Sequence, residues 1–212
     1  MTLADPPHEL ADRYDAVVVG SGYGGGVAAS RLARAGRRVA VLERGRERGP
    51  GDFPASAGAA WREVHIDSPD GSRGDPESLY DVRRNEDMTV LVACGLGGGS
   101  LINAGVALQA DDRVFADPCW PEELRVPGTL AQAYAQAREM LAPQPYPHDA
   151  PPKLLALQAG ATAVGATFSR PPITVSFADG PNHVGVEQRA CRECGDCVAG
   201  CNFRAKGSVD VT

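Results

Sequence analysis

Four of the chain's six cysteines lie close together, in a stretch where their spacing could bind a metal. The spacing is C-x2-C-x2-C-x3-C, and the four are Cys191, Cys194, Cys197 and Cys201. Deprotonated thiols are soft ligands, and runs of this kind ligate iron–sulfur clusters. A 4Fe–4S cluster held by the Cys-rich loop 190–204 is therefore one interpretation of these residues.

Three interpretations of the loop remain open. In two-cluster ferredoxins the fourth cysteine ligates the other cluster, but here there is no second run, and Asn202 stands where those ferredoxins have proline. One cluster held by the first three cysteines would need another thiolate, for which the chain offers Cys94 and Cys119. Zinc bound by four thiolates is the second interpretation, although zinc sites usually separate two C-x2-C pairs. Thiols without a metal are the third.

A glycine motif near the N-terminus predicts a different chemistry. Gly20, Gly22 and Gly25 fill the pattern G-x-G-x-x-G, and the acidic Glu43 follows. The first glycine permits a tight turn, the second lets the backbone approach a pyrophosphate, and the third lets a helix pack closely on a strand. Glu43 can accept hydrogen bonds from ribose hydroxyls and would repel a 2′-phosphate, which argues against NADP. NAD and FAD remain open at this point.

The elements around the motif are those that a dinucleotide site requires. Residues 15–20 (DAVVVG) predict a buried parallel strand, residues 27–36 have helical spacing, and residues 37–45 predict a second strand that ends in an acid. In this context the glycine motif indicates the first βαβ unit of a Rossmann-like α/β fold.

A second glycine cluster favours FAD over NAD. Residues 88–110 contain a strand-like run, TVLVA, followed by glycines 97–99. One NAD rarely needs two phosphate cradles, whereas a flavin dinucleotide is longer and its ring needs its own contacts. Ser100 and Asn103 offer side-chain hydrogen bonds to the ring or its ribityl chain. The other interpretation is a glycine-rich turn between a strand and a helix.

The two motifs together resemble the glucose–methanol–choline (GMC) family of FAD-dependent oxidoreductases. DAVVVGSGYGGG and RRVAVLERG are similar to the family's N-terminal motif, and GGGSLIN at 97–103 is similar to its second signature. The third glycine and the following N-x-G are closer to the sterol (cholesterol) oxidases than to the alcohol oxidases. The resemblance covers about residues 13–110 and returns at 191–210.

This resemblance implies an activity and a set of cofactor contacts. The reaction would be oxidation of the CH–OH group of an alcohol or sterol, with hydride passing to flavin N5. Ala104 departs from a glycine common in the sterol oxidases. The implied FAD contacts are Gly20, Gly22, Tyr23, Gly24, Gly25, Glu43, Gly98, Gly99, Ser100, Asn103, Ala104 and Val106.

The resemblance also implies that the chain is the N-terminal part of a larger enzyme. Residues 1–12 would be a tail and 13–212 the FAD-binding domain, including a Pro-rich loop at 142–152. Residues 45–58 and 67–78 also have loop composition. The family's catalytic base is typically a histidine, and none of His8, His65, His148 and His183 stands in a matching stretch. No catalytic residue is therefore predicted, and this chain alone is expected to be inactive.

Composition limits the partners. The net charge is −6, and no basic stripe indicates nucleic acid. No apolar run approaches the roughly 20 residues that span a bilayer, and no signal peptide is visible, which predicts a cytoplasmic protein. The expected partners are a small-molecule alcohol or sterol and, if a cluster is present, an electron-transfer protein. The alternatives are a ferredoxin-like electron-transfer module and an NAD-dependent dehydrogenase.

Overall fold

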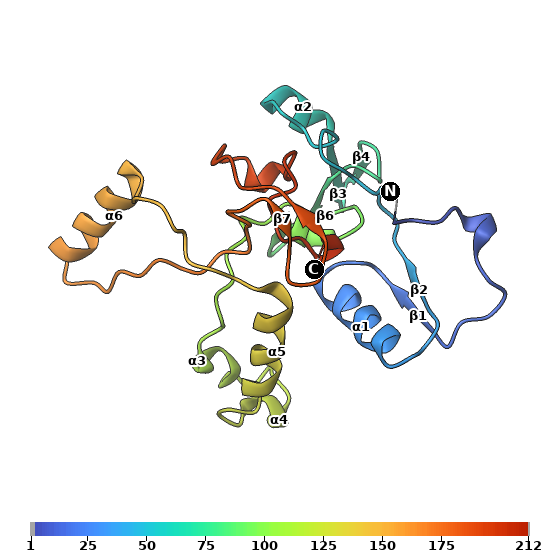
Figure 1. Cartoon of the computed structure of the whole chain (residues 1–212), viewed down its shortest axis with the longest axis horizontal. Coiled ribbons are helices and arrows are strands. Elements are labelled where there is room, and N and C mark those ends of the chain that lie inside the picture. The colour runs from blue at the N-terminus through green and yellow to red at the C-terminus, as the bar shows by residue number, and fades with distance from the viewer. Residues whose placement is uncertain (1–2, 212) are drawn as a thin grey trace.

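The computed structural model describes residues 3–211 and has a mixed α/β architecture (Figure 1). The strands are β1 (Ala16–Val19), β2 (Val39–Leu42), β3 (Val64–Ser68), β4 (Gly71–Arg73), β5 (Tyr80–Arg84), β6 (Thr89–Ala93), β7 (Gly180–Pro181) and β8 (Glu187–Gln188). The α-helices are α1 (Tyr23–Arg34), α2 (Ala57–Arg62), α3 (Asp112–Phe115), α4 (Glu122–Arg125), α5 (Ala131–Leu141) and α6 (Pro152–Ala163). Short 3₁₀ helices are η1 (Pro7–Glu9), η2 (Gly98–Leu101), η3 (Cys197–Ala199) and η4 (Val209–Val211).

The predicted βαβ unit is present at the N-terminal end. Strands β1 and β2 pair in parallel, with Ala16 opposite Val39 and Val19 opposite Leu42. Helix α1 connects them and begins at Tyr23, earlier than its apolar pattern predicts, because the glycines after Gly22 are already helical. Within residues 3–211 no third strand joins this sheet, so the Rossmann-like part of the fold is this single unit.

A four-stranded sheet follows, and most of it was not predicted from the sequence. Its order is β4-β3-β5-β6, with β3 and β5 parallel and the other two pairs antiparallel. Strand β6 matches the predicted TVLVA run. The expectation of loop structure at 67–78 is wrong in part, since β4 and the end of β3 lie there. The turn-forming residues in this stretch predicted a loop, but β4 pairs with β3 and β3 pairs with β5, which stabilises both strands.

The small buried core lies between this sheet and the second glycine cluster. Phe53, Leu79 and Leu101 form its centre, and Tyr80 and Ile102 pack against it. Burying apolar side chains from distant segments removes their surface from water and fixes the segments together. The core therefore joins the start of β5 to the turn that carries the GGGSLIN signature.

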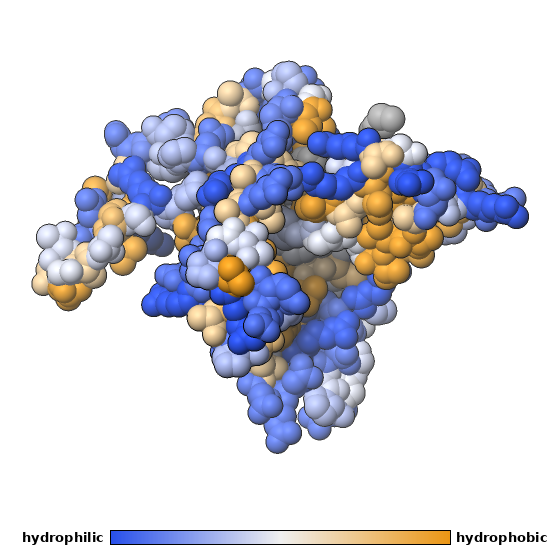
Figure 2. Space-filling view, turned by 90° about the horizontal axis from the view of Figure 1, so that it is seen from below, coloured by the Kyte–Doolittle hydropathy of each residue, from blue (hydrophilic) through white to orange (hydrophobic). Residues whose placement is uncertain are grey.

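One face of the β1–β2 sheet is uncovered. An added Cβ on Gly25 of α1 would lie 3.2 Å from the Val18 side chain, so Val18 faces the helix. Side chains alternate along a strand, and Val17 (57 % exposed) and Val19 (84 % exposed) therefore point to the other face. The expectation of a fully buried strand is wrong for this face, which Figure 2 shows as an apolar patch at the right.

The remaining helices lie away from the two sheets. Helices α3, α4 and α5 cluster on one side of the molecule, and α6 stands apart from the body (Figure 1). The chain between α5 and α6 runs through the stretch predicted as a Pro-rich loop at 142–152, whose last residue begins α6. Across residues 3–211, none of the helices combines the length and apolar character that a membrane crossing requires.

The C-terminal segment returns to the centre of the molecule. Ser176 N–H donates to Ala205 O (2.7 Å), and Gly207 N–H donates to Thr174 O (2.8 Å). The following η4 then reaches α1, where an added Cβ on Gly26 would lie 2.2 Å from the Val209 side chain. Residues 205–211 are thereby brought beside both glycine-rich segments.

Candidate functional site

The first glycine-rich turn is built by close packing of backbone on backbone. Gly20 has a φ of +87°, in the left-handed region that favours glycine. A Cβ on Gly25 would lie 1.9 Å from Gly20 O, so a side chain at this position would collide with the turn. The roles predicted for Gly20 in the turn and for Gly25 in helix–strand packing are therefore confirmed.

The two glycine-rich turns meet at their backbones. Chain leaving β6 turns through Gly97 (φ +107°) and Gly98 (φ +53°) into η2. A Cβ on Gly98 would lie 2.7 Å from Gly22 Cα, which leaves no room for a side chain at that position. Two segments more than 70 residues apart therefore form one continuous backbone surface next to the N-terminus of α1.

Ser21 connects these two turns to Glu43. The buried Ser21 hydroxyl donates to Glu43 Oε2 (2.6 Å) and accepts from Gly97 N–H (2.9 Å). Glu43 also accepts from Ser21 N–H (2.9 Å) and from Gly45 N–H (2.9 Å). Burial alone would raise the pKa of Glu43, but these hydrogen bonds outweigh it and lower the pKa, so the group is ionised at neutral pH.

The sequence reasoning missed Ser21, although it occupies the variable position between the first two glycines of the motif. The sequence does not show that the Ser21 hydroxyl links the two turns, because its partner Gly97 is far away along the chain. Glu43 accepts hydrogen bonds from the Ser21 hydroxyl and from backbone N–H groups, including that of Arg44. These bonds hold its carboxylate beside the first glycine-rich turn.

The structure brings Tyr23 and Asn103 together across the two turns. Asn103 Nδ2–H donates to the Tyr23 hydroxyl, and Asn103 Oδ1 accepts from Gly105 N–H (3.0 Å). Burial raises the pKa of Tyr23 and the Asn103 hydrogen bond lowers it in part, so the phenol is neutral at pH 7. Ala104 and Val106 follow directly and are exposed.

Three other residues predicted to contact FAD are Ser100, Gly24 and Gly99, and their surroundings differ from one another. Ser100 is fully buried, donates to Gly97 O (2.6 Å) and accepts from Val209 N–H (2.9 Å). Its expected contact with a flavin is corrected, because its hydroxyl holds η2 to the C-terminal segment. Nothing lies within 4 Å of an added Cβ on Gly24 or Gly99, so these glycines border open space.

Comparison with known proteins finds an FAD-binding family and several relatives named as oxidases. Residues 15–83 match the family described as FAD binding domain. A cholesterol oxidase of Acinetobacter baumannii is 28 % identical over 93 % of this chain and 37 % of its own length. One of Mycobacterium tuberculosis (strain CDC 1551 / Oshkosh) is 30 % identical over 92 % of this chain and 36 % of its own length. A long-chain-alcohol oxidase of Arabidopsis thaliana is 35 % identical over 49 % of this chain and 12 % of its own length.

These matches support a GMC-like FAD family for this chain. It spans little more than a third of the length of the cholesterol oxidases that it matches. FAD is the cofactor, and the residues present fit it. No side chain caps the start of α1 in the described structure, so its first N–H groups are available to an anion beside glycines that leave no room for Cβ atoms.

Lys206 is the second residue of this site that the sequence reasoning missed. It is 4 % exposed, and its ammonium donates to Leu101 O (2.9 Å), to Asn103 O and to Cys197 O (3.0 Å). Burial lowers the pKa of Lys206 to about 8, and nearby thiols and Asp210 oppose that shift. The only sequence signal was its place in the stretch KGSVDVT, which is similar to a family motif.

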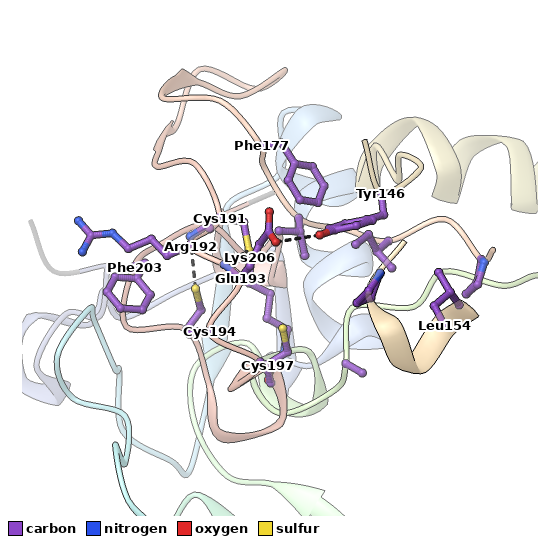
Figure 3. A pocket seen from close by; sticks show the side chains of 18 of the residues that line it. Tyr146, Leu154, Phe177, Cys191, Arg192, Glu193, Cys194, Cys197, Phe203 and Lys206 are labelled. Carbon is purple, nitrogen blue, oxygen red and sulfur yellow. Dashed lines mark hydrogen bonds between the residues drawn. The ribbon is translucent and has the colours of Figure 1, made fainter. Parts of the chain in front are cut away.

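The Cys-rich loop does not form a metal site in this structure. The thiols of Cys191, Cys194, Cys197 and Cys201 are free, and the labelled ones lie at separate places around the loop (Figure 3). Within the described chain no three His, Cys, Asp or Glu side chains are arranged as metal ligands. The iron–sulfur and zinc interpretations are therefore unsupported, because spacing along a chain does not by itself make thiols converge.

Asn202 shows what orders the loop instead. Its Oδ1 accepts from Gly51 N–H (2.8 Å) and Phe53 N–H (3.1 Å), and its Nδ2–H donates to Phe53 O (3.0 Å). Proline at this position could make none of these hydrogen bonds. Burial, followed by neighbouring thiols, raises the pKa of Cys197, while Lys206 lowers it.

An apolar cavity of about 570 Å³ lies beside the loop. Figure 3 shows Tyr146, Phe177 and Phe203 around it, with Lys206 at its inner side. The Tyr146 hydroxyl donates to Glu193 Oε2 (2.8 Å) across the cavity rim. Ala104 also borders the cavity, so this space adjoins the second glycine signature.

The four histidines lie outside the glycine-rich turns. His8 and His183 are exposed, and His148 packs edge-on against Tyr146 and Phe177. His65 is buried in β3, where Asp81 and Ser72 bind both ring nitrogens. None of these contacts involves a residue predicted to bind FAD.

Proposed function

We propose that this chain holds FAD in an oxidoreductase that acts on the CH–OH group of an alcohol or sterol. The observation that carries this proposal is the direct contact of the two glycine-rich turns at Gly22 and Gly98, linked to Glu43 through Ser21. A single mononucleotide needs one such turn, whereas an FAD molecule has a nucleotide end and a flavin end to hold. Residues 13–212 would form the FAD-binding part of such an enzyme.

Each end of the cofactor has its own residues in this proposal. The N–H groups at the start of α1 bind the pyrophosphate, aided by the positive end of the helix dipole. Glu43, which is ionised, accepts a hydrogen bond from the adenosine ribose. Tyr23, Asn103, Ala104 and Val106 border the flavin end. When bound, FAD supplies the hydride acceptor of the reaction.

The substrate class is supported by the relatives and by the cavity. The relatives are named cholesterol oxidase and long-chain-alcohol oxidase, both of which act on apolar alcohols. The apolar cavity that adjoins Ala104 is of a size typical of small-molecule sites. No base is assigned among the described residues, so alcohol oxidation is a property proposed for the whole enzyme.

The proposal is tested at the nucleotide end with Glu43→Gln, which removes the charge and keeps the side-chain length. We expect FAD affinity, measured by quenching of flavin fluorescence, to fall by about 10-fold to 100-fold, because a charge-assisted hydrogen bond is lost. Glu47→Gln is the matched control, since Glu47 lies on the same connection but bonds to the Leu3 and Ala4 N–H groups.

Two results would contradict the proposal. One is an unmodified chain that does not bind FAD at micromolar concentrations. The other is equal FAD affinity in the Glu43→Gln and Glu47→Gln proteins, which would remove Glu43 from the nucleotide site. Circular dichroism of both variants confirms that they are folded before affinity is compared.

A further inference from the structure

Lys206 has a set of contacts that a surface lysine does not make. Its ammonium has three N–H donors, and all three are used on backbone carbonyls, those of Leu101, Asn103 and Cys197. Two of these carbonyls belong to the GGGSLIN signature and one to the Cys-rich loop. A buried charge is costly unless it is fully hydrogen-bonded, and here the hydrogen bonds come from two segments about 100 residues apart.

The bond to Asn103 O has a consequence for the next residue. A peptide unit is planar, so fixing the Asn103 carbonyl also fixes the direction of the Ala104 N–H. Within residues 3–211 no acceptor is recorded for this N–H, and Ala104 is exposed beside the apolar cavity. The Asn103 side chain is held as well, by Tyr23 and by Gly105 N–H. The result is an oriented backbone donor without a protein partner.

We propose that Lys206 is a positioning residue that sets the Leu101–Ala104 turn so that the Ala104 N–H points at the flavin ring. This inference rests on the proposed FAD site. The Cys-rich loop is part of the arrangement, because the carbonyl of Cys197 holds the third donor of Lys206. The loop thereby supports the flavin end of the site.

A lysine that only stabilised the fold would affect both ends of the cofactor site equally. Glu43 and the start of α1, which bind the nucleotide in our proposal, make no hydrogen bond to Lys206. ADP tests that end alone, whereas FAD tests both ends. The ratio of FAD affinity to ADP affinity therefore separates a positioning role from a general loss of stability.

The experiment measures both affinities for the unmodified chain, Lys206→Met and Lys206→Arg. Methionine fills similar space but donates no hydrogen bond, and arginine retains charge and donors. Lys153→Met is the matched control, since Lys153 is the chain's only other lysine and is exposed. We expect Lys206→Met to weaken FAD binding by about 10-fold while ADP binding stays within about 2-fold, with partial recovery in Lys206→Arg.

The absorbance band of bound flavin, recorded at saturating FAD, is the second measurement. Lys206→Met should shift this band relative to the unmodified protein and to Lys153→Met, because the donor at the ring edge is no longer oriented. If Lys206→Met does not fold, Lys206→Gln, which still has two donors, takes its place. Equal losses of FAD and ADP affinity with an unchanged band would overturn the inference. They would leave the proposed function intact, provided that the unmodified chain binds FAD.

Discussion

Asp81 is the most strongly hydrogen-bonded buried acid among the residues described. It is 1 % exposed and accepts from His65 Nδ1–H (3.0 Å), from Arg44 (2.7 Å) and from Arg83 (2.9 Å). The other ring nitrogen of His65 accepts from the Ser72 hydroxyl (2.7 Å), an assignment that follows from the hydrogen-bond network. This network joins three strands of the larger sheet to the segment after β2.

The network predicts a loss of stability in acid. Burial would raise the pKa of Asp81, but the hydrogen bonds from His65 and the two arginines outweigh it and lower the pKa to about 2. A carboxyl group whose pKa is lowered on folding stabilises the fold at pH values above its ordinary pKa, which is near 3.8. This contribution is lost as the pH falls through the folded-state pKa of about 2. Asp81→Asn should therefore lower the free energy of unfolding by about 2 kcal/mol at pH 7 and by only about 0.4 kcal/mol at pH 2, where Asp81 is half protonated.

Urea denaturation at pH 7, 4 and 2 measures this difference. Asp70→Asn is the control, since Asp70 is exposed in the β3–β4 turn. An Asp81→Asn protein whose deficit is the same at pH 7 and pH 2 would show that the network contributes through packing and not through charge.

Among single residues, the sequence identified those whose role follows from local spacing and missed those whose partners are distant along the chain. Gly20, Gly25 and Glu43 follow from the spacing around a predicted strand. Ser21 and Lys206 do not, because each acquires its role from a segment more than 70 residues away. Local spacing carries no information about such contacts, and the same limitation explains why the cysteine spacing did not predict the geometry of its thiols.

At the scale of elements, the packing of α1 on β1 depends on one glycine. Gly25→Ala would place a methyl group 1.9 Å from Gly20 O and 3.2 Å from the Val18 side chain, so helix and strand must separate. We expect the free energy of unfolding to fall by about 3 kcal/mol, as for other overpacked sites. Differential scanning calorimetry should show a lower unfolding midpoint. The purified protein should also retain less FAD.

The neighbouring Gly24→Ala is a closely matched control. An added Cβ there has nothing within 4 Å, and alanine is the better helix former by up to about 1 kcal/mol. Its stability should be unchanged or slightly higher. A Gly25→Ala protein as stable as Gly24→Ala would contradict the packing argument.

The elements themselves were predictable where the apolar pattern was strong. Strands β1, β2 and β6 are runs of valine, leucine and alanine, which fit a pleated surface whatever their partners. Strands β3, β4 and β5 carry charged or turn-forming residues such as Asp67, Gly71 and Arg84, so their signal was that of a loop. Their pairing with one another, and that of β5 with β6, decides their conformation, and pairing is a tertiary property.

At the scale of the whole molecule, the described chain exposes many large apolar side chains and buries few. Helix α1 covers one face of the β1–β2 sheet, while Val17, Val19 and Leu42 (45 % exposed) form a patch on the other face (Figure 2). Contiguous exposed apolar patches on soluble proteins mark surfaces that associate. The free edge of β1 adds unpaired backbone groups to the same place.

This patch should make the isolated chain self-associate, and Val19→Lys should reduce that association. Val19 is 84 % exposed, so the substitution removes apolar surface from the patch with little effect on the core. We expect lower light scattering and weaker fluorescence of a bound apolar dye, with an unchanged unfolding midpoint. Val164→Lys is the control, because Val164 is 78 % exposed at the end of α6, far from the β1–β2 sheet in Figure 1. If both variants reduced scattering equally, general charge and not this patch would govern solubility, since each substitution adds the same single positive charge.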